Sequence, residues 1–208
     1  MSVAVITLTV TVVNYHWPMA RWEPDARGRL EQAAMELYAD RGFENTTVAE
    51  IAERAGLTER TFFRHYADKR EVLFGGAGEL QDALVSAVSE VPDSAAPLDA
   101  VATGLESVGS WLEEQRGREY ASRRQRIINA NTELQERELI KFASLSAALA
   151  DILRKRGTGE PAASLTAEVG IAAFKVAFER WIRRSNRRNL PELIRDSLDE
   201  LRAVAVSR

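Results

Sequence analysis

The chain of 208 residues contains no cysteine and only two histidines, His16 and His65, which lie far apart in the sequence. Without cysteine, the chain has no disulfide framework, no thiolate nucleophile and no thiolate metal site. Two distant histidines also make a poor set of metal ligands. We therefore expect no metal and no cofactor, and a chain suited to a reducing cytoplasm.

An excess of positive charge is missing as well. Lysine and arginine together number 28 against 31 aspartates and glutamates, so the formal net charge is -3. Proteins that bind a polyanion through overall attraction show the opposite balance. Any surface for nucleic acid must therefore be local.

Long apolar runs are scarce, and the one candidate is the opening segment MSVAVITLTVTVVNYHW. This segment falls short of the roughly 20 apolar residues that a spanning helix needs, and no basic residue precedes it. We expect residues 1–20 to form a flexible or strand-like extension and predict no membrane partner. The alternative is that native translation begins at Met19, so that residues 1–18 do not belong to the native protein.

The rest of the chain indicates helices. From Pro24 onward, apolar residues recur at helical spacing, and the stretches stop at glycine, proline or short polar clusters. We predict an all-α protein with a three-helix head over residues 21–74 and a larger helical body over residues 75–208. In the body, helices are expected over 79–91, 98–116, 119–129, 132–156, 162–184 and 191–205.

The head contains the signals of a helix-turn-helix. Thr47 and Glu50 have the spacing of a capping box that opens the second helix, which ends at Gly56. Thr58 can then cap a third, short helix over 58–66. The segment 68–71 repeats the capping-box spacing and is expected to open a fourth helix. Two short helices around a glycine turn form the arrangement that docks on DNA.

The third helix has an apolar side and a polar side. Phe62 and Tyr66, with Leu57, can anchor it to the first two helices. The outward residues are then Thr58, Glu59, Arg60, Thr61, Arg64 and His65, with Phe63 at the margin. A helix in the major groove reads base edges near its N-terminus, so we predict base contacts from Arg60 and Thr61.

Phosphate contacts are expected beside this helix. Thr47 and Lys69 are placed at the starts of the second and fourth helices, where free amides attract an anion. Arg64 and His65 can add to that clamp. A single threonine at such a position is more often only a helix cap, and a single arginine is usually solvated. The order of all these residues along the segment is therefore what indicates DNA binding.

The last two helices carry apolar stripes. On the first of them, one stripe is bulky and the other consists of the small residues Gly170, Ala173 and Ala177, which would permit a close helix contact. The bulky stripe is Ile171, Phe174, Phe178 and Trp181, and the last helix adds Leu190, Leu193, Ile194, Leu198, Leu201 and Val204. These stripes fit either a four-helix dimer interface or the core of the subunit itself.

A pocket for a small, largely apolar molecule is expected between body helices outside that interface. The bulky candidates to line it are Trp111, Tyr120, Phe142, Phe174 and Phe178. Polar contacts are expected from Arg126 and Asn129, with Asn131 as a further candidate. The alternative is again that these aromatic residues are core.

Two other classes of function compete with DNA binding, an enzyme and a protein-binding adaptor. An enzyme is not indicated, because no P-loop, metalloprotease helix or nucleophile elbow occurs, and the segment 75–78 (GGAG) lacks the strand that a dinucleotide site needs. A helical adaptor that binds protein through the head would use the same exposed side chains. DNA binding should weaken steeply with salt, and adaptor binding should not.

The segment GFENTTVAEIAERAGLTERTFFRHYADKREVL resembles the DNA-binding head of the TetR family of bacterial transcriptional regulators. The matching positions are Thr46, Thr47, Gly56, Thr61, Phe62, Phe63, His65, Tyr66 and Lys69. The family often has tyrosine where this chain has Phe63, which cannot offer a hydroxyl to a phosphate. The resemblance covers about a quarter of the chain, from Arg27 to Phe74.

This resemblance implies a cytoplasmic protein of the bacterial nucleoid that forms a homodimer through its last two helices. Such a protein binds a pseudo-palindromic operator and usually represses transcription. It dissociates from the operator when a small molecule binds in the body. The segment RRQRIINANTELQERELIKFASLSAALADILRKRG is also similar to actinobacterial members, some of which answer to acyl-coenzyme A or other lipid-like effectors. In such a mechanism, the ligand shifts the helix that joins head to body and changes the separation of the two recognition helices.

Overall fold

The computed structural model describes residues 25–206, and the extension expected over residues 1–20 lies outside this range. All of the regular elements within it are helical, which confirms the all-α prediction. The head contains α1 (Ala26–Arg41), α2 (Val48–Arg54), α3 (Glu59–His65) and the 3₁₀ helix η1 (Glu71–Phe74). The body contains α4 (Ala77–Ser89), α5 (Pro97–Gln115), α6 (Gly117–Asn129), α7 (Thr132–Lys155), α8 (Ala162–Trp181) and α9 (Leu190–Val206).

The start of α2 follows from local chemistry. The Glu50 amide donates to the Thr47 hydroxyl at 3.2 Å, and the Thr47 amide donates to the Glu50 carboxylate at 2.9 Å. The expected capping box is therefore present. Those hydrogen bonds from Thr47, with the nearby Arg41, lower the pKa of Glu50.

The second expected capping box did not form a helix of the expected kind. Asp68 accepts hydrogen bonds from the amides of Arg70 and Glu71, but only η1 follows, and α4 begins at Ala77. The physical reason is that the Glu71 carboxylate does not turn back to cap. It pairs instead with Arg137 and Lys141 of α7, so the head is tied to the body at this point.

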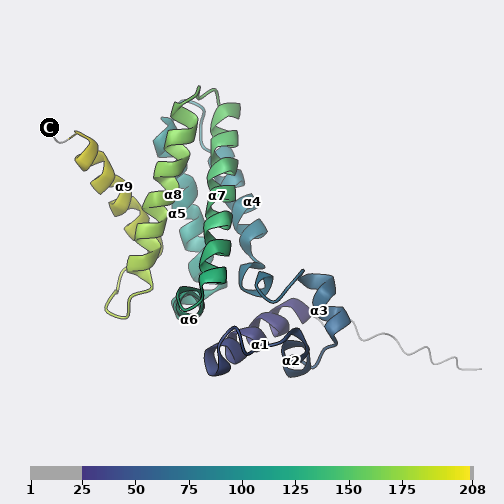
Figure 1. The fold of residues 1–208 in the computed structure, drawn as a ribbon. Coiled ribbons are helices and arrows are strands. Elements are labelled where there is room, and N and C mark those ends of the chain that lie inside the picture. Colours follow the sequence, from purple (N-terminus) through teal and green to yellow (C-terminus); the bar gives the residue numbers. More distant parts are fainter. Residues whose placement is uncertain (1–24, 207–208) are drawn as a thin grey trace, which may run out of the picture.

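The body is a bundle in which α4, α5, α7 and α8 run roughly alongside one another, with α9 packed obliquely against α5 and α8 (Figure 1). Its core includes Leu84, Leu105, Leu149 and Trp181, all at most 1% exposed. α8 ends at Trp181, three residues before the expected end. The head lies beside the base of this bundle, next to α6 (Figure 1).

The small-residue stripe of α8 lies inside the subunit. A Cβ added at Gly170 would lie 2.5 Å from Cγ1 of Val101 on α5, and Ala173 and Ala177 are buried. Most of the bulky stripe and of the apolar edge of α9 is buried in the same body core. Phe178 and Leu201 are half-buried, and Val204 is exposed. Of the two interpretations left open by the sequence, the core of the subunit is the one that applies to these buried residues.

The head does not complete its own hydrophobic core. Its cluster is built on α1, α2, α3 and η1, with Phe62 of α3 fully buried. Ile127 and Ile128 of α6 and Leu134 of α7 belong to the same cluster. The body therefore sets how the head is held.

Across residues 25–206, no helix combines the length and apolar character required to cross a membrane.

The close crossing of α5 and α8 gives a first prediction. Gly170→Ala adds a methyl group against Val101, and such overpacking costs about 1–3 kcal/mol. The better helix propensity of alanine offsets up to about 1 kcal/mol of this cost. We therefore expect a net decrease in the free energy of unfolding, measured by urea denaturation. In a Val101→Ala background, the same change should become neutral or stabilising. An equal loss of stability in both backgrounds would contradict the contact between residue 170 and Val101.

Candidate functional site

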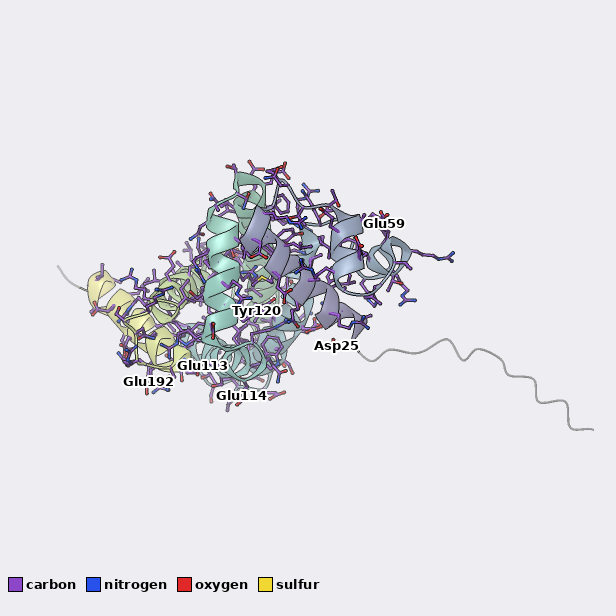
Figure 2. The ribbon with its side chains drawn as sticks, turned by 90° about the horizontal axis from the view of Figure 1, so that it is seen from below. Asp25, Glu59, Glu113, Glu114, Tyr120 and Glu192 are labelled. Carbon is purple, nitrogen blue, oxygen red and sulfur yellow. The ribbon has the colours of Figure 1, made fainter. Side chains whose placement is uncertain are left out.

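The short helix α3 is held by one side and open on the other. Phe62 is fully buried and Tyr66 is 4% exposed, so both anchor α3 in the head core. Phe63 is 55% exposed, and its ring meets that of Phe62 edge-on with centroids 5.5 Å apart. In the view from below, Glu59 marks the start of this helix on the side of the head away from α6 (Figure 2). α3 therefore presents one side to the outside.

The open side carries the residues predicted to meet DNA. The exposed members are Thr58, Glu59, Arg60, Phe63, Arg64 and His65, while Thr61 is half-buried. Thr58 caps the helix, because its hydroxyl accepts the Thr61 amide at 3.2 Å. Its hydroxyl oxygen also lies 3.1 Å from that of Thr61. Two basic side chains, Arg60 and Arg64, thus stand on the exposed surface of a capped helix.

The turn before α3 requires a glycine. Gly56 has φ +66°, in the left-handed region that L side chains rarely adopt. Its amide donates to the Glu53 carbonyl and the next amide, from Leu57, donates to the Ala52 carbonyl at 2.8 Å. These bonds close α2 and set the direction in which α3 leaves it.

Thr47 lies at the exposed N-terminus of α2, but its hydroxyl is already occupied. It accepts from the Glu50 amide and lies 2.9 Å from the Glu50 carboxylate. A phosphate that approached the end of α2 would therefore meet a carboxylate as well as the hydroxyl and amides.

Lys69 is placed differently from the expectation. It does not begin a helix, and its ammonium group turns into the loop between α1 and α2. There it donates to the carbonyl oxygens of Phe43 at 2.8 Å and Thr46 at 3.0 Å, with the Phe43 ring 4.3 Å away. The Tyr38 hydroxyl donates to the Lys69 carbonyl at 2.6 Å and holds the segment on α1. In this arrangement Lys69 supports the loop that leads to Thr47.

A cavity of about 330 Å³ lies in the body beside the head. The aromatic residues that line it are Phe74 of η1 and, from the body, Trp111, Tyr120, Phe142, Phe174 and Phe178. Phe174 lies between Phe142 and Phe178, with ring centroids 6.5 Å and 6.0 Å away. All five aromatic residues expected to line a pocket are thus brought together.

The expected polar contacts are wrong in position. Arg126 and Asn129 are exposed and do not line this cavity. On α6, Ile127 and Ile128 turn toward the head core, so these two neighbours face outward. Asn129 accepts a hydrogen bond from Gln125 there, and Arg126 donates to the Ser122 carbonyl.

Charged residues that the sequence did not reveal line the cavity on the side of the head. They are Glu31, Arg116, Arg124, Glu138 and Lys141. Arg116, which lies between α5 and α6, and Tyr120 and Arg124 on α6 recur every four residues, a spacing that could have identified both arginines. Glu31 belongs to α1 of the head, and no local pattern connects it to the body.

Two ion pairs form among these charges, Glu31 with Arg116 and Glu138 with Arg124. Both carboxylate oxygens of Glu31 accept hydrogen bonds from Arg116, and Glu31 is only 6% exposed. Burial disfavours the charge on Arg116, but the bonds and attraction from Glu31 raise its pKa overall. Burial and the negative charge of Glu31 also raise the pKa of Tyr120. Tyr120 lies on α6, with α1 running beside that helix (Figure 2).

Family models match both parts of the chain. The model described as bacterial regulatory proteins of the tetR family matches residues 31–74. The model described as the MftR C-terminal domain matches residues 95–205.

Two curated relatives are named as transcriptional regulators. TcmR of Streptomyces glaucescens is 37% identical over 82 residues, which is 39% of this chain and 36% of TcmR. MftR of Mycobacterium tuberculosis is 26% identical over 157 residues, which is 74% of this chain and 78% of MftR. The first match thus spans about a third of the relative and the second more than three quarters.

Solved structures share the fold. Thermus thermophilus FadR, a TetR-family repressor in complex with lauroyl-CoA, has a TM-score of 0.54 at 23% identity, covering 88% of this chain and 96% of that one. The fatty acid degradation regulator FadR of Bacillus halodurans has a TM-score of 0.59 at 16% identity, covering 88% and 97%. Since one family model lies on the helix-turn-helix and the other spans more than half of the 208 residues, the chain belongs to the TetR family of bacterial transcriptional regulators.

Proposed function

We propose that this protein is a ligand-responsive repressor that binds a pseudo-palindromic operator as a homodimer. Residues 21–74 form the DNA-binding domain and residues 75–208 form the regulatory and dimerisation domain. The observation that carries the proposal is the orientation of α3, with Phe62 and Tyr66 buried while Arg60 and Arg64 stand exposed. A helix held in this way can enter the major groove of DNA.

The residues of α3 are assigned to different parts of the DNA according to their position along the helix. Arg60, in the first turn, is assigned to a guanine edge, and the methyl group of Thr61 is assigned to a thymine methyl. Thr58, Arg64 and His65 are assigned to phosphates, which they can reach as exposed side chains. Phe63 offers an apolar surface to the sugar-phosphate backbone.

Thr47 and Lys69 act together at the edge of the head. At Thr47, the amides at the start of α2 that lie outside the capping box are assigned to a phosphate. Lys69 keeps the loop before Thr47 in place through the carbonyl oxygens of Phe43 and Thr46, and adds its positive charge to that edge. Its contribution to affinity is therefore both electrostatic and structural.

The effector is a small, largely apolar molecule that fills the cavity among the five aromatic residues. A volume of about 330 Å³ is at the small end of typical ligand pockets. FadR of Thermus thermophilus, which shares the fold, is in complex with lauroyl-CoA, a ligand with a long apolar acyl chain. Gly76, Ala77 and Leu80 at the start of α4 line the cavity, so a ligand there can shift the helix that joins the head to the body.

The dimer surface consists of the outer faces of α8 and α9. Leu165 and Val176 are 61% and 52% exposed on α8, with Ala172 exposed and Val169 half-buried between them. These four residues follow one another at intervals of four, three and four, which is the seam of a helix pair. Val204 adds an exposed apolar residue on α9.

The repressor works in the cytoplasm, at the nucleoid, and has no catalytic role. An adaptor that binds protein through α3 is the other candidate, and ionic strength separates the two. Binding to DNA should fall with a salt slope of about -0.9 per phosphate contacted. Footprinting on genomic DNA should show two half-sites about 10 base pairs apart, or a multiple of that spacing.

The assignment of Arg60 predicts a change in specificity. Arg60→Ala should alter the preference at one base pair of each half-site by about 1–3 kcal/mol, measured on a panel of substituted operators. Arg64→Ala is the matched control and should weaken binding to all sequences alike. A uniform loss from Arg60→Ala would contradict the assignment.

The contacts of Lys69 predict a change in stability without DNA. Lys69→Met should lower the free energy of unfolding by about 1–3 kcal/mol, because the loop carbonyls lose their donor. The exposed Arg64, changed to Met, should leave the urea midpoint nearly unchanged. Equal midpoints for the two variants would show that Lys69 has no structural role.

The α8 surface predicts the oligomeric state. Val176→Glu places a charge in the apolar seam and should shift the protein toward monomers in sedimentation equilibrium, with loss of operator binding. Leu139→Glu on α7, where the native side chain is 60% exposed, should remain dimeric. A dimeric Val176→Glu protein would place the interface elsewhere.

A further inference from the structure

The cavity has two unlike sides. Trp111, Phe142, Phe174 and Phe178 supply an aromatic surface, while Arg116 and the other charged residues lie toward the head. The charged lining residues comprise three cations and two carboxylates, Arg116, Arg124, Lys141, Glu31 and Glu138, and the partner of Lys141, Glu71, lies outside the lining. Such a cavity suits a molecule with an apolar part and one anionic group.

The cations of the cavity also hold the head. Arg124 donates to the Leu73 carbonyl of η1 at 2.7 Å, and Lys141 lies 3.3 Å from the Glu71 carboxylate. Arg116 pairs with Glu31 of α1. Side chains that face a ligand are therefore the same ones that attach α1 and η1 to the body.

Arg116 occupies the central position among these links. A Cβ added at Gly76 would lie 3.2 Å from its Nη2 atom, so the guanidinium group rests against the residue before α4. On the other side it binds both oxygens of Glu31. One guanidinium thus contacts α1 and the start of α4 and faces the cavity.

Glu31 depends on this partner. Its carboxylate is 6% exposed, and a buried carboxylate is costly unless it is paired. A second carboxylate on the same guanidinium face would repel Glu31 in a poorly hydrated site. An anionic ligand and Glu31 must therefore compete for Arg116.

We propose that the effector is an amphipathic organic anion whose acidic group displaces the Glu31 carboxylate from Arg116 and so releases α1 from the body. This inference rests on the proposed function and names the chemical class of the effector and the link that it breaks. The apolar part of the ligand packs on the aromatic side of the cavity. Glu31, once unpaired, moves toward water and takes α1 with it.

The test uses the full chain without DNA, with decanoate as the anionic probe and decan-1-ol as its uncharged counterpart. Calorimetry should show that decanoate binds more tightly than decan-1-ol. Glu31→Gln removes the competitor, so decanoate affinity should rise by about 5- to 150-fold, the usual range of coupling between sites. Decan-1-ol affinity should stay within about twofold, since a change of 0.4 kcal/mol or less is near the limit of additivity for uncoupled groups.

Amide hydrogen exchange measures the release of α1 from the body. Decanoate should speed amide exchange in α1 of the native protein, and Glu31→Gln should do the same without any ligand. Glu36→Gln is the matched control, because it breaks the ion pair between Glu36 of α1 and Arg54 of α2, neither of which lines the cavity. It should leave decanoate affinity unchanged.

Arg116 is tested by two variants. Arg116→Gln should abolish the preference for decanoate over decan-1-ol, and Arg116→Lys should restore part of it by keeping the positive charge. The Glu31→Gln results stand by themselves if Arg116→Gln does not fold. The proposal is overturned if decanoate fails to bind, binds no better than decan-1-ol, or binds Glu31→Gln no more tightly than the native protein. Since no DNA is present, failure of operator binding would be seen separately, in the footprinting experiment.

Discussion

The head of this protein depends on the body for its hydrophobic core. Ile127 and Ile128 of α6 and Leu134 of α7 pack into the same cluster as Phe62 of α3. Hydrophobic burial is the main favourable term in folding, so a head that shares its core with the body is not free to turn independently. The direction in which α3 presents Arg60 is consequently set by α6 as well as by the neighbouring helices of the head.

This shared core explains why the charges at the junction matter. Apolar packing gives little directional control, whereas the pairs Glu31–Arg116 and Glu71–Arg137 join particular points of the head to particular points of the body. A buried pair contributes little net stability, but removing one partner is costly. Such links fit the proposed release of α1 from the body.

The helix-turn-helix itself was predictable from local chemistry. The capping box of Thr47 and Glu50 and the glycine turn at Gly56 each depend on residues a few positions apart, and both are present. The same reasoning failed at Asp68 because Glu71 found distant partners in Arg137 and Lys141. It also failed for Arg126 and Asn129, since the rotation of α6 is decided by the head core that Ile127 and Ile128 enter.

By itself, the sequence determined the helices, their caps and the two-sided character of α3, because spacing along the chain controls hydrogen bonds within three or four residues. It also indicated five of the aromatic residues that line the cavity, but not Phe74 of η1. Only the tertiary structure decided that Glu31 meets Arg116, 85 residues away, and that Lys69 turns into the loop between α1 and α2. Those contacts depend on how helices pack across the whole chain, and a carboxylate or an ammonium group takes whichever partner that packing brings within reach.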